Sequence, residues 1–162
     1  MRDVKAWNIR VTAMRQNQDL PALRLGWREW VRLPSLGIER IKAKVDTGAR
    51  TSALHAFKIE RTQIQGVDSV RIWLHPLQYD KTEVVVCESP IIDQRSVRDS
   101  GGHSELRFVI ETELLLGTES RKVELTVTSR ETMRFRLLIG RTALQNAAVF
   151  PSQSYLLGKI TA

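Results

Sequence analysis

Alternation of apolar and polar residues is the feature that most constrains the fold of this chain. In the segment IKAKV, residues 41–45, three aliphatic residues alternate with two lysines. A period of two places the aliphatic side chains on one face of a half-buried β-strand. The same alternation recurs in four further segments, at residues 69–74, 83–88, 105–116 and 122–128.

Turn residues separate these alternating segments. A Pro34–Gly37 turn divides two short expected strands after Gly26, and further turn signals are found at 66–68, 89–90, 100–102 and 117–120. A short helix is expected only in RTALQNA, directly after Gly140. We therefore predict an all-β single domain, closed or nearly closed into a barrel, because closure removes unpaired strand edges.

The composition indicates the cellular compartment in which such a domain functions. The chain has 162 residues and 42% hydrophobic residues, with no apolar run near the ~20 residues of a membrane-spanning helix. Its first thirty residues hold no apolar stretch typical of a secretory signal. Cys87 is a single cysteine and forms no internal disulfide, which fits a reducing compartment. We expect a cytoplasmic protein without a membrane partner.

The net charge of +7 is unevenly distributed. Residues 1–44 carry a net +6 and residues 45–162 a net +1. This excess of positive charge favours acidic partners, namely nucleic acid, anionic membrane or a polyacidic peptide. The alternative is that the Lys and Arg side chains only keep a tail and one face of the protein solvated. Residues 1–25 show no clean period, so we treat them as a basic amino-terminal segment of uncertain structure and place the domain at 26–162.

The tetrapeptide at 46–49 is the first candidate for chemistry. Asp46 ends an expected strand and is followed by the small residues Thr47, Gly48 and Ala49. Glycine lets another backbone approach closely, and the threonine hydroxyl bonds locally or across to a partner. A carboxylate on such a turn holds water, but Asp-Thr-Gly is also an acceptable loop with no chemical role.

A second motif follows about ninety residues later. RLLIGRTAL, residues 136–144, consists of aliphatic residues, a Gly-Arg pair and the short helix. Together with Asp-Thr-Gly-Ala, this segment resembles the retropepsin-type aspartic peptidases. The segment between them, residues 97–117, resembles their flap, a Gly-tipped hairpin followed by a long alternating strand. More narrowly, the chain is similar to bacterial RimB-like proteins, which are associated with a RimK-type ligase that adds glutamates to a ribosomal protein. Some of these proteins carry the label ATP-dependent zinc protease.

The resemblance implies a retropepsin-like acid-protease barrel over 26–162 and an aspartic endopeptidase. Such an enzyme holds water between two carboxylates that share a proton. Because this chain has one Asp-Thr-Gly, the resemblance implies a homodimer with Asp46 from each subunit at the two-fold axis.

The resemblance also assigns roles to residues around Asp46, each with a structural alternative. Thr47 would lock the two turns together, or serve as a turn hydroxyl. The flap over the substrate would consist of Ser100, Gly101, Gly102 and His103. The floor behind Asp46 would consist of Ile139, Gly140 and Arg141.

One position departs from the retropepsin pattern. Many retropepsins have an Asp four residues after the catalytic one, whereas this chain has Arg50. Arg50 and Arg141 then need other carboxylates, in the chain or on a ligand, since a guanidinium suits bidentate carboxylate binding. Arg50 and Arg98 are the expected substrate-binding residues, although Arg98, Arg107 and Arg141 also fit a solvated surface. An acidic or glutamate-extended peptide is the favoured ligand.

We expect neither a metal nor another cofactor. The chain has no His-Glu-x-x-His motif, and its three histidines and Cys87 show no regular ligand spacing. A Gly-x-x-x-x-Gly-Lys-Ser/Thr loop is also missing from the sequence.

Two other functions compete with the homodimeric peptidase. The main alternative is a non-catalytic retropepsin-like module that regulates a RimK-type ligase or a ribosomal protein. A nucleic-acid binder that stacks bases on tryptophan is disfavoured, because Trp7, Trp27, Trp30 and Trp73 form no basic-aromatic motif.

Overall fold

The computed structural model describes residues 23–98, 101–130 and 132–158, and this part of the chain is nearly all β. The prediction of a mostly-β single domain is confirmed. The strands are β1 Leu23–Gly26, β2 Arg28–Leu33, β3 Ile38–Val45, β4 Ser52–Ala56, β5 Lys58–Ile64, β6 Val67–Leu74, β7 Val85–Pro90, β8 Asp93–Arg98, β9 Ser104–Leu116, β10 Glu119–Ser129, β11 Leu137–Ile139 and β12 Ala147–Phe150. Two 3₁₀ helices accompany them, η1 Pro34–Leu36 and η2 Arg141–Ala143.

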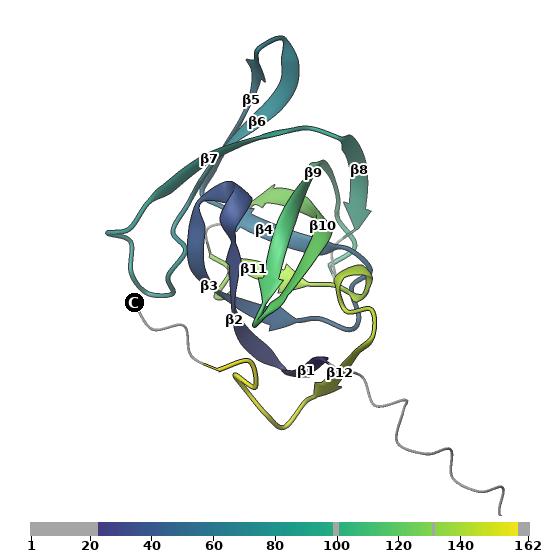
Figure 1. The fold of residues 1–162 in the computed structure, drawn as a ribbon. Coiled ribbons are helices and arrows are strands. Elements are labelled where there is room, and N and C mark those ends of the chain that lie inside the picture. The colour runs from purple at the N-terminus through teal and green to yellow at the C-terminus, as the bar shows by residue number, and fades with distance from the viewer. Residues whose placement is uncertain (1–22, 99–100, 131, 159–162) are drawn as a thin grey trace, which may run out of the picture.

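Six of these strands close into a barrel. Their order is β10-β4-β11-β3-β2-β9, and an antiparallel pairing of β9 with β10 completes the ring (Figure 1). Strand β8 continues the sheet beyond β9. Among the described residues, each of the six strands has a neighbour on both sides, and removal of unpaired edges is the reason closure was expected.

The interior of the barrel holds the aliphatic residues of the alternating segments. Ile41 and Ala43 of β3 are fully buried, and Leu125 of β10 and Leu137 of β11 are equally inaccessible. Burial of each such aliphatic side chain contributes on the order of 1.5–3 kcal/mol. The period-two pattern therefore sets which face of each strand points inward.

Strands β5, β6 and β7 form a separate antiparallel sheet that projects from the barrel (Figure 1). Its strands carry surface ion pairs, such as Arg61 with Asp68 at 2.6 Å. Ile72 and Cys87 are neighbours in register and are both buried. This sheet lies outside the ring of strands that carries the Asp46 turn.

The first and last strands pair with each other. β1 and β12 run parallel, with Leu23 opposite Ala147 and Gly26 opposite Phe150. Residues 1–22 lie outside the described part of the chain, so nothing tests the structure expected for the basic segment. β1 begins at Leu23, three residues before the boundary placed at Gly26.

After β12 the chain folds back over β2 through residues 153–157, called here the C-terminal latch. The fully buried carboxylate of Glu29 accepts hydrogen bonds from the backbone N–H groups of Leu156 and Leu157, at 2.9 and 3.2 Å. It also accepts one from Gly26 at 2.6 Å. The latch passes so close to Gly26 that a Cβ there would collide with the carbonyl oxygen of Gln153.

The short helix expected after Gly140 is present as the 3₁₀ turn η2, which is shorter than the RTALQNA segment suggested. Within the described residues, no helix combines the length and apolar character that a bilayer crossing requires.

Candidate functional site

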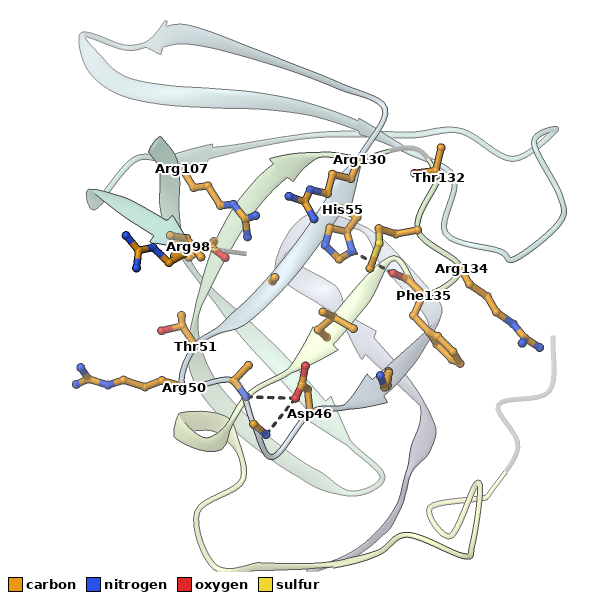
Figure 2. A pocket seen from close by; sticks show the side chains of 18 of the residues that line it. Asp46, Arg50, Thr51, His55, Arg98, Arg107, Arg130, Thr132, Arg134 and Phe135 are labelled. Atoms are coloured by element: carbon orange, nitrogen blue, oxygen red, sulfur yellow. Dashed lines mark hydrogen bonds between the residues drawn. The ribbon is translucent and has the colours of Figure 1, made fainter. Parts of the chain in front are cut away.

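Asp46 lies directly after β3, at the start of a tight turn. Its Oδ1 atom accepts hydrogen bonds from the backbone N–H groups of Gly48 at 3.0 Å and Ala49 at 3.2 Å (Figure 2). The side chain is half-buried. One carboxylate oxygen therefore holds the turn in shape, as an Asx turn does.

The Ile-Gly-Arg segment lies against this turn. The N–H of Asp46 donates to the carbonyl of Ile139 at 2.9 Å, where β11 runs parallel to β3. The Arg141 guanidinium donates to the carbonyl oxygens of Thr47 at 3.0 Å and Gly48 at 2.8 Å. Sequence reasoning expected a carboxylate partner for Arg141, and the structure gives it backbone carbonyls instead.

Gly140 makes this packing sterically feasible. A Cβ at this position would lie 2.6 Å from the backbone carbon of Thr51 and 2.8 Å from the carbonyl oxygen of Arg50. Its buried N–H donates to the Ser52 hydroxyl at 3.0 Å. The two loops meet backbone to backbone, an approach that requires glycine.

Above the turn lies an open groove of about 950 Å³. Of the described residues that line it, six are lysine or arginine and one is acidic, Asp46. The cationic residues come from six separate places in the chain: Lys44, Arg50, Arg98, Arg107, Arg130 and Arg134. Figure 2 shows that Arg50, Arg98 and Arg107 gather on one side of Asp46. The lining is therefore predominantly cationic.

Arg107 belongs to the wall of this groove. Its side chain is 7% exposed, and its Nε donates to the Glu105 carboxylate at 2.9 Å. Glu105 in turn accepts a hydrogen bond from the Thr128 hydroxyl at 3.1 Å. A buried cation needs such a partner to offset its desolvation, so Arg107 is a fixed part of the wall and no solvated surface residue.

His55 is buried beneath the groove. Its Nδ1 lies 3.0 Å from the carbonyl oxygen of Phe135, so Nδ1 carries the hydrogen that it donates. Burial lowers the pKa of His55, and the positive charges of Arg107, Arg130 and Arg136 lower it further, against the opposing hydrogen bond to Phe135. The lowered pKa of His55 thus reflects the positive charge of the arginines around it.

The structure brings only some of the predicted site residues to the groove. Those that line it are Asp46, Gly48, Ala49, Arg50 and Arg98. Those behind the turn or away from the lining are Thr47, Gly101, Gly102, His103, Ile139, Gly140 and Arg141. Ser100 lies outside the described residues. The β8–β9 hairpin, expected as a flap, contributes Val97, Arg98 and Arg107 to the groove.

Sequence reasoning missed several lining residues: Trp27, Lys44, Thr51, His55, Arg130, Met133, Arg134 and Phe135. One signal was available. Residues 130–141 hold four arginines, an unusual density ahead of the Ile-Gly-Arg motif. No local signal marks Trp27, which reaches the site only through the fold.

No metal centre is formed by the residues that the structure describes. Among them, no three histidine, cysteine, aspartate or glutamate side chains are arranged to hold an ion. His75 stacks on Phe57 at 4.6 Å between ring centroids, and Cys87 lies in the projecting sheet. A second Asp46, which only a partner chain supplies, stays a prediction, as does the homodimer.

Comparison with known proteins identifies relatives. Residues 24–159 match the RimB-like family, described as "Retropepsin-like aspartic endopeptidase RimB". A "Probable alpha-L-glutamate ligase" of Desulfotalea psychrophila is 41% identical over 90% of this chain and 32% of its own length. A protein of the same name from Shewanella pealeana is 43% identical over 83% of this chain and 30% of its own length. The chain thus spans about a third of these curated relatives.

A crystal structure shares the fold. It is a Legionella pneumophila protein of unknown function, with a TM-score of 0.67 and 25% identity, matched over 84% of this chain and 98% of its own.

These relatives correct the expected activity. The expectation of an aspartic endopeptidase is contradicted, since curated proteins at 41–44% identity are named probable alpha-L-glutamate ligase. The zinc protease label is likewise without support among the comparisons.

Proposed function

The chain belongs to the RimB-like family of retropepsin-like proteins, and on that premise we propose that it is a non-catalytic binding module for the acidic peptide handled by an alpha-L-glutamate ligase. The module holds a glutamate-bearing chain in the groove above Asp46. The two partners considered from sequence are a RimK-type ligase and a ribosomal protein, and a glutamate-extended tail of the latter would present this chemistry.

The charge of the groove carries the proposal. Six cationic residues face one carboxylate among the described lining residues. Guanidinium groups bind carboxylates in a bidentate manner and more strongly than neutral donors do. A run of glutamates offers carboxylates at short intervals to Arg50 and Arg98, which stand on the same side of the groove as the buried Arg107 (Figure 2).

The curated relatives supply the ligase context. The matched region makes up about a third of each, so most of their length lies beyond this chain. A binding module within or beside a ligase raises the effective concentration of its acidic chain near the ligase site. This would favour repeated additions to one chain.

Asp46 has a defined place in this function. Its carboxylate is the one repulsive group among the described lining residues. We expect it to keep glutamate side chains away from the turn and to direct them towards Arg50 and Arg98. Removing its charge should therefore preserve or tighten binding of an acidic peptide.

The test is a titration of the chain into fluorescein-labelled hexaglutamate, followed by anisotropy, with hexaglutamine as the matched neutral peptide. We expect binding of hexaglutamate only, with an affinity that falls steeply as salt rises. Arg98→Ala should weaken binding about tenfold, the loss of one charge-assisted contact. Arg61→Ala is the control, because Arg61 lies in the projecting sheet with Asp68 as its partner.

Two results would contradict the proposal. One is equal affinity for the two peptides. The other is peptide cleavage, detected by mass spectrometry, that disappears in Asp46→Asn, since a binding module has no use for a reactive carboxylate.

A further inference from the structure

The groove has two chemically different ends. Arg50, Arg98 and Arg107 lie on one side of Asp46, whereas Phe135 lies on the other (Figure 2). Arg134 also stands on the Phe135 side, but its guanidinium points away from the groove. Three of the six cationic lining residues therefore stand together at one end.

Apolar side chains form the other end. Trp27 meets Phe135 edge to face, with ring centroids 5.8 Å apart and an interplanar angle of 73°. Trp27, Met133 and Leu138 are each half-buried, and all three line the groove. Lys44 of β3 lies opposite Leu138 of β11 where the two strands pair. A cationic side chain therefore stands beside the apolar wall at this end.

The position of Trp27 is fixed from three directions. Its N–H donates to the carbonyl of Gln153 in the C-terminal latch, and its carbonyl accepts from Val45, the residue before Asp46, both at 2.9 Å. The Arg28 guanidinium lies 4.5 Å from the ring centroid. A rigid aromatic wall costs little conformational entropy when a ligand packs against it.

A single half-exposed apolar residue needs no functional explanation. Here, three of them share one cavity and lie beside the turn that the cationic residues flank. Ligand pockets combine an apolar wall with a few charged groups in this way.

We infer that the groove recognises a composite peptide, in which a large apolar side chain directly adjoins the acidic run. The apolar side chain packs on Trp27, Met133 and Leu138, while the glutamates bind Arg50 and Arg98 beside the buried charge of Arg107. The ligand is thus the junction between an acidic extension and the sequence that bears it, a finer specificity that rests on the proposed function.

The size of the preference follows from the buried area. Burial of one aromatic side chain of the ligand against the Trp27 wall should improve affinity about tenfold over alanine. This figure allows for the entropy cost of ordering that side chain.

The test compares three labelled peptides: tetraglutamate preceded by Phe, followed by Phe, and flanked by Ala on both sides. We expect one of the two Phe peptides to bind about tenfold more tightly than the Ala peptide. Trp27→Ala and Met133→Ser should each reduce this preference at least threefold, with little change for the Ala peptide. Thermal melting checks that each variant is folded.

Trp73→Ala is the matched control. Trp73 also carries a cation over its ring, Lys58 at 4.4 Å, but it does not line the groove. Its replacement should leave the preference intact.

The outcomes separate the inference from the proposed function. If none of the three peptides binds, the proposed function fails. If all three bind with equal affinity, or if both groove variants weaken all three equally, the acidic binding stands and the composite specificity is wrong.

Discussion

The carboxylate of Glu29 accepts a hydrogen bond of 2.9 Å from the backbone N–H of Leu156, 127 residues later in the chain. Two further N–H groups, of Gly26 and Leu157, complete its coordination. Because Glu29 is fully buried, this carboxylate is the anchor of the C-terminal latch.

Glu29→Gln should therefore destabilise the fold. An amide offers one acceptor oxygen where the carboxylate offers two, so at least one of the three N–H groups loses its partner, at a cost of about 1–3 kcal/mol. Urea unfolding measures the loss. Glu39→Gln on the exposed side of β3 is the control and should change stability by less than about 0.5 kcal/mol. Equal stabilities of the two variants would contradict the anchoring role.

Gly140→Ala should destabilise the site region through overpacking. The added methyl group would lie 2.6 Å from a backbone carbon of Thr51, and neither backbone moves easily. We expect a loss of about 1–3 kcal/mol in denaturant unfolding. Gly48→Ala is the matched comparison, since its Cβ meets only the Asp46 side chain, at 3.2 Å. A smaller loss at Gly140 than at Gly48 would refute this account of the packing.

His55 should titrate below its ordinary value of 6.5, because burial and nearby arginines lower its pKa. Below pH 6.5 the unfolded chain binds a proton that the folded chain resists, so stability falls as the pH drops from 6.5 towards the folded-state pKa. NMR of the imidazole measures the midpoint. Bound hexaglutamate should raise the titration midpoint of His55 by offsetting the positive charge. The variant His55→Asn should lose the part of the pH dependence of stability that this histidine causes. A midpoint at or above 6.5 in the free protein would be inconsistent with the burial described.

Cys87 should be unreactive in the native protein. Burial, assisted by the charge of Glu88, raises its pKa to about 11. At pH 8 only about one thiol in a thousand is then ionised, and the thiolate is the reactive species. Iodoacetamide should modify Cys87 in urea and leave it intact in buffer. Rapid labelling of the folded chain would show that the projecting sheet opens.

The barrel was predictable because strand alternation is a local property. The positions 41, 43 and 45 face inward as their period requires, and the turn signals at 34–37, 66–68 and 117–120 fall at strand breaks. The turn expected at 89–90 is wrong, because Ser89 and Pro90 are the last residues of β7 and pair with β6. The proximity of Asp46 to Ile139 followed from the resemblance, since nothing within either segment alone indicates the other.

The cationic groove was not predictable in the same way. Arg98, Arg107 and Arg130 lie on different strands or loops, and only barrel closure brings them together. Glu29 reads as an ordinary polar residue in a strand, because its partners are distant backbone groups without a sequence signature. His55 breaks the alternation in β4, where all five residues are buried.

The hydrogen bonds that join Gln153 to Trp27 and Trp27 to Val45 also bear on how the protein is made. Synthesis proceeds from the amino end, so the wall beside Asp46 waits for Gln153, which follows Trp27 by 126 residues. Contacts of such long sequence separation form late, after the local strand pairs. A nascent chain therefore exposes its arginines well before it has a finished surface to present to an anionic ligand.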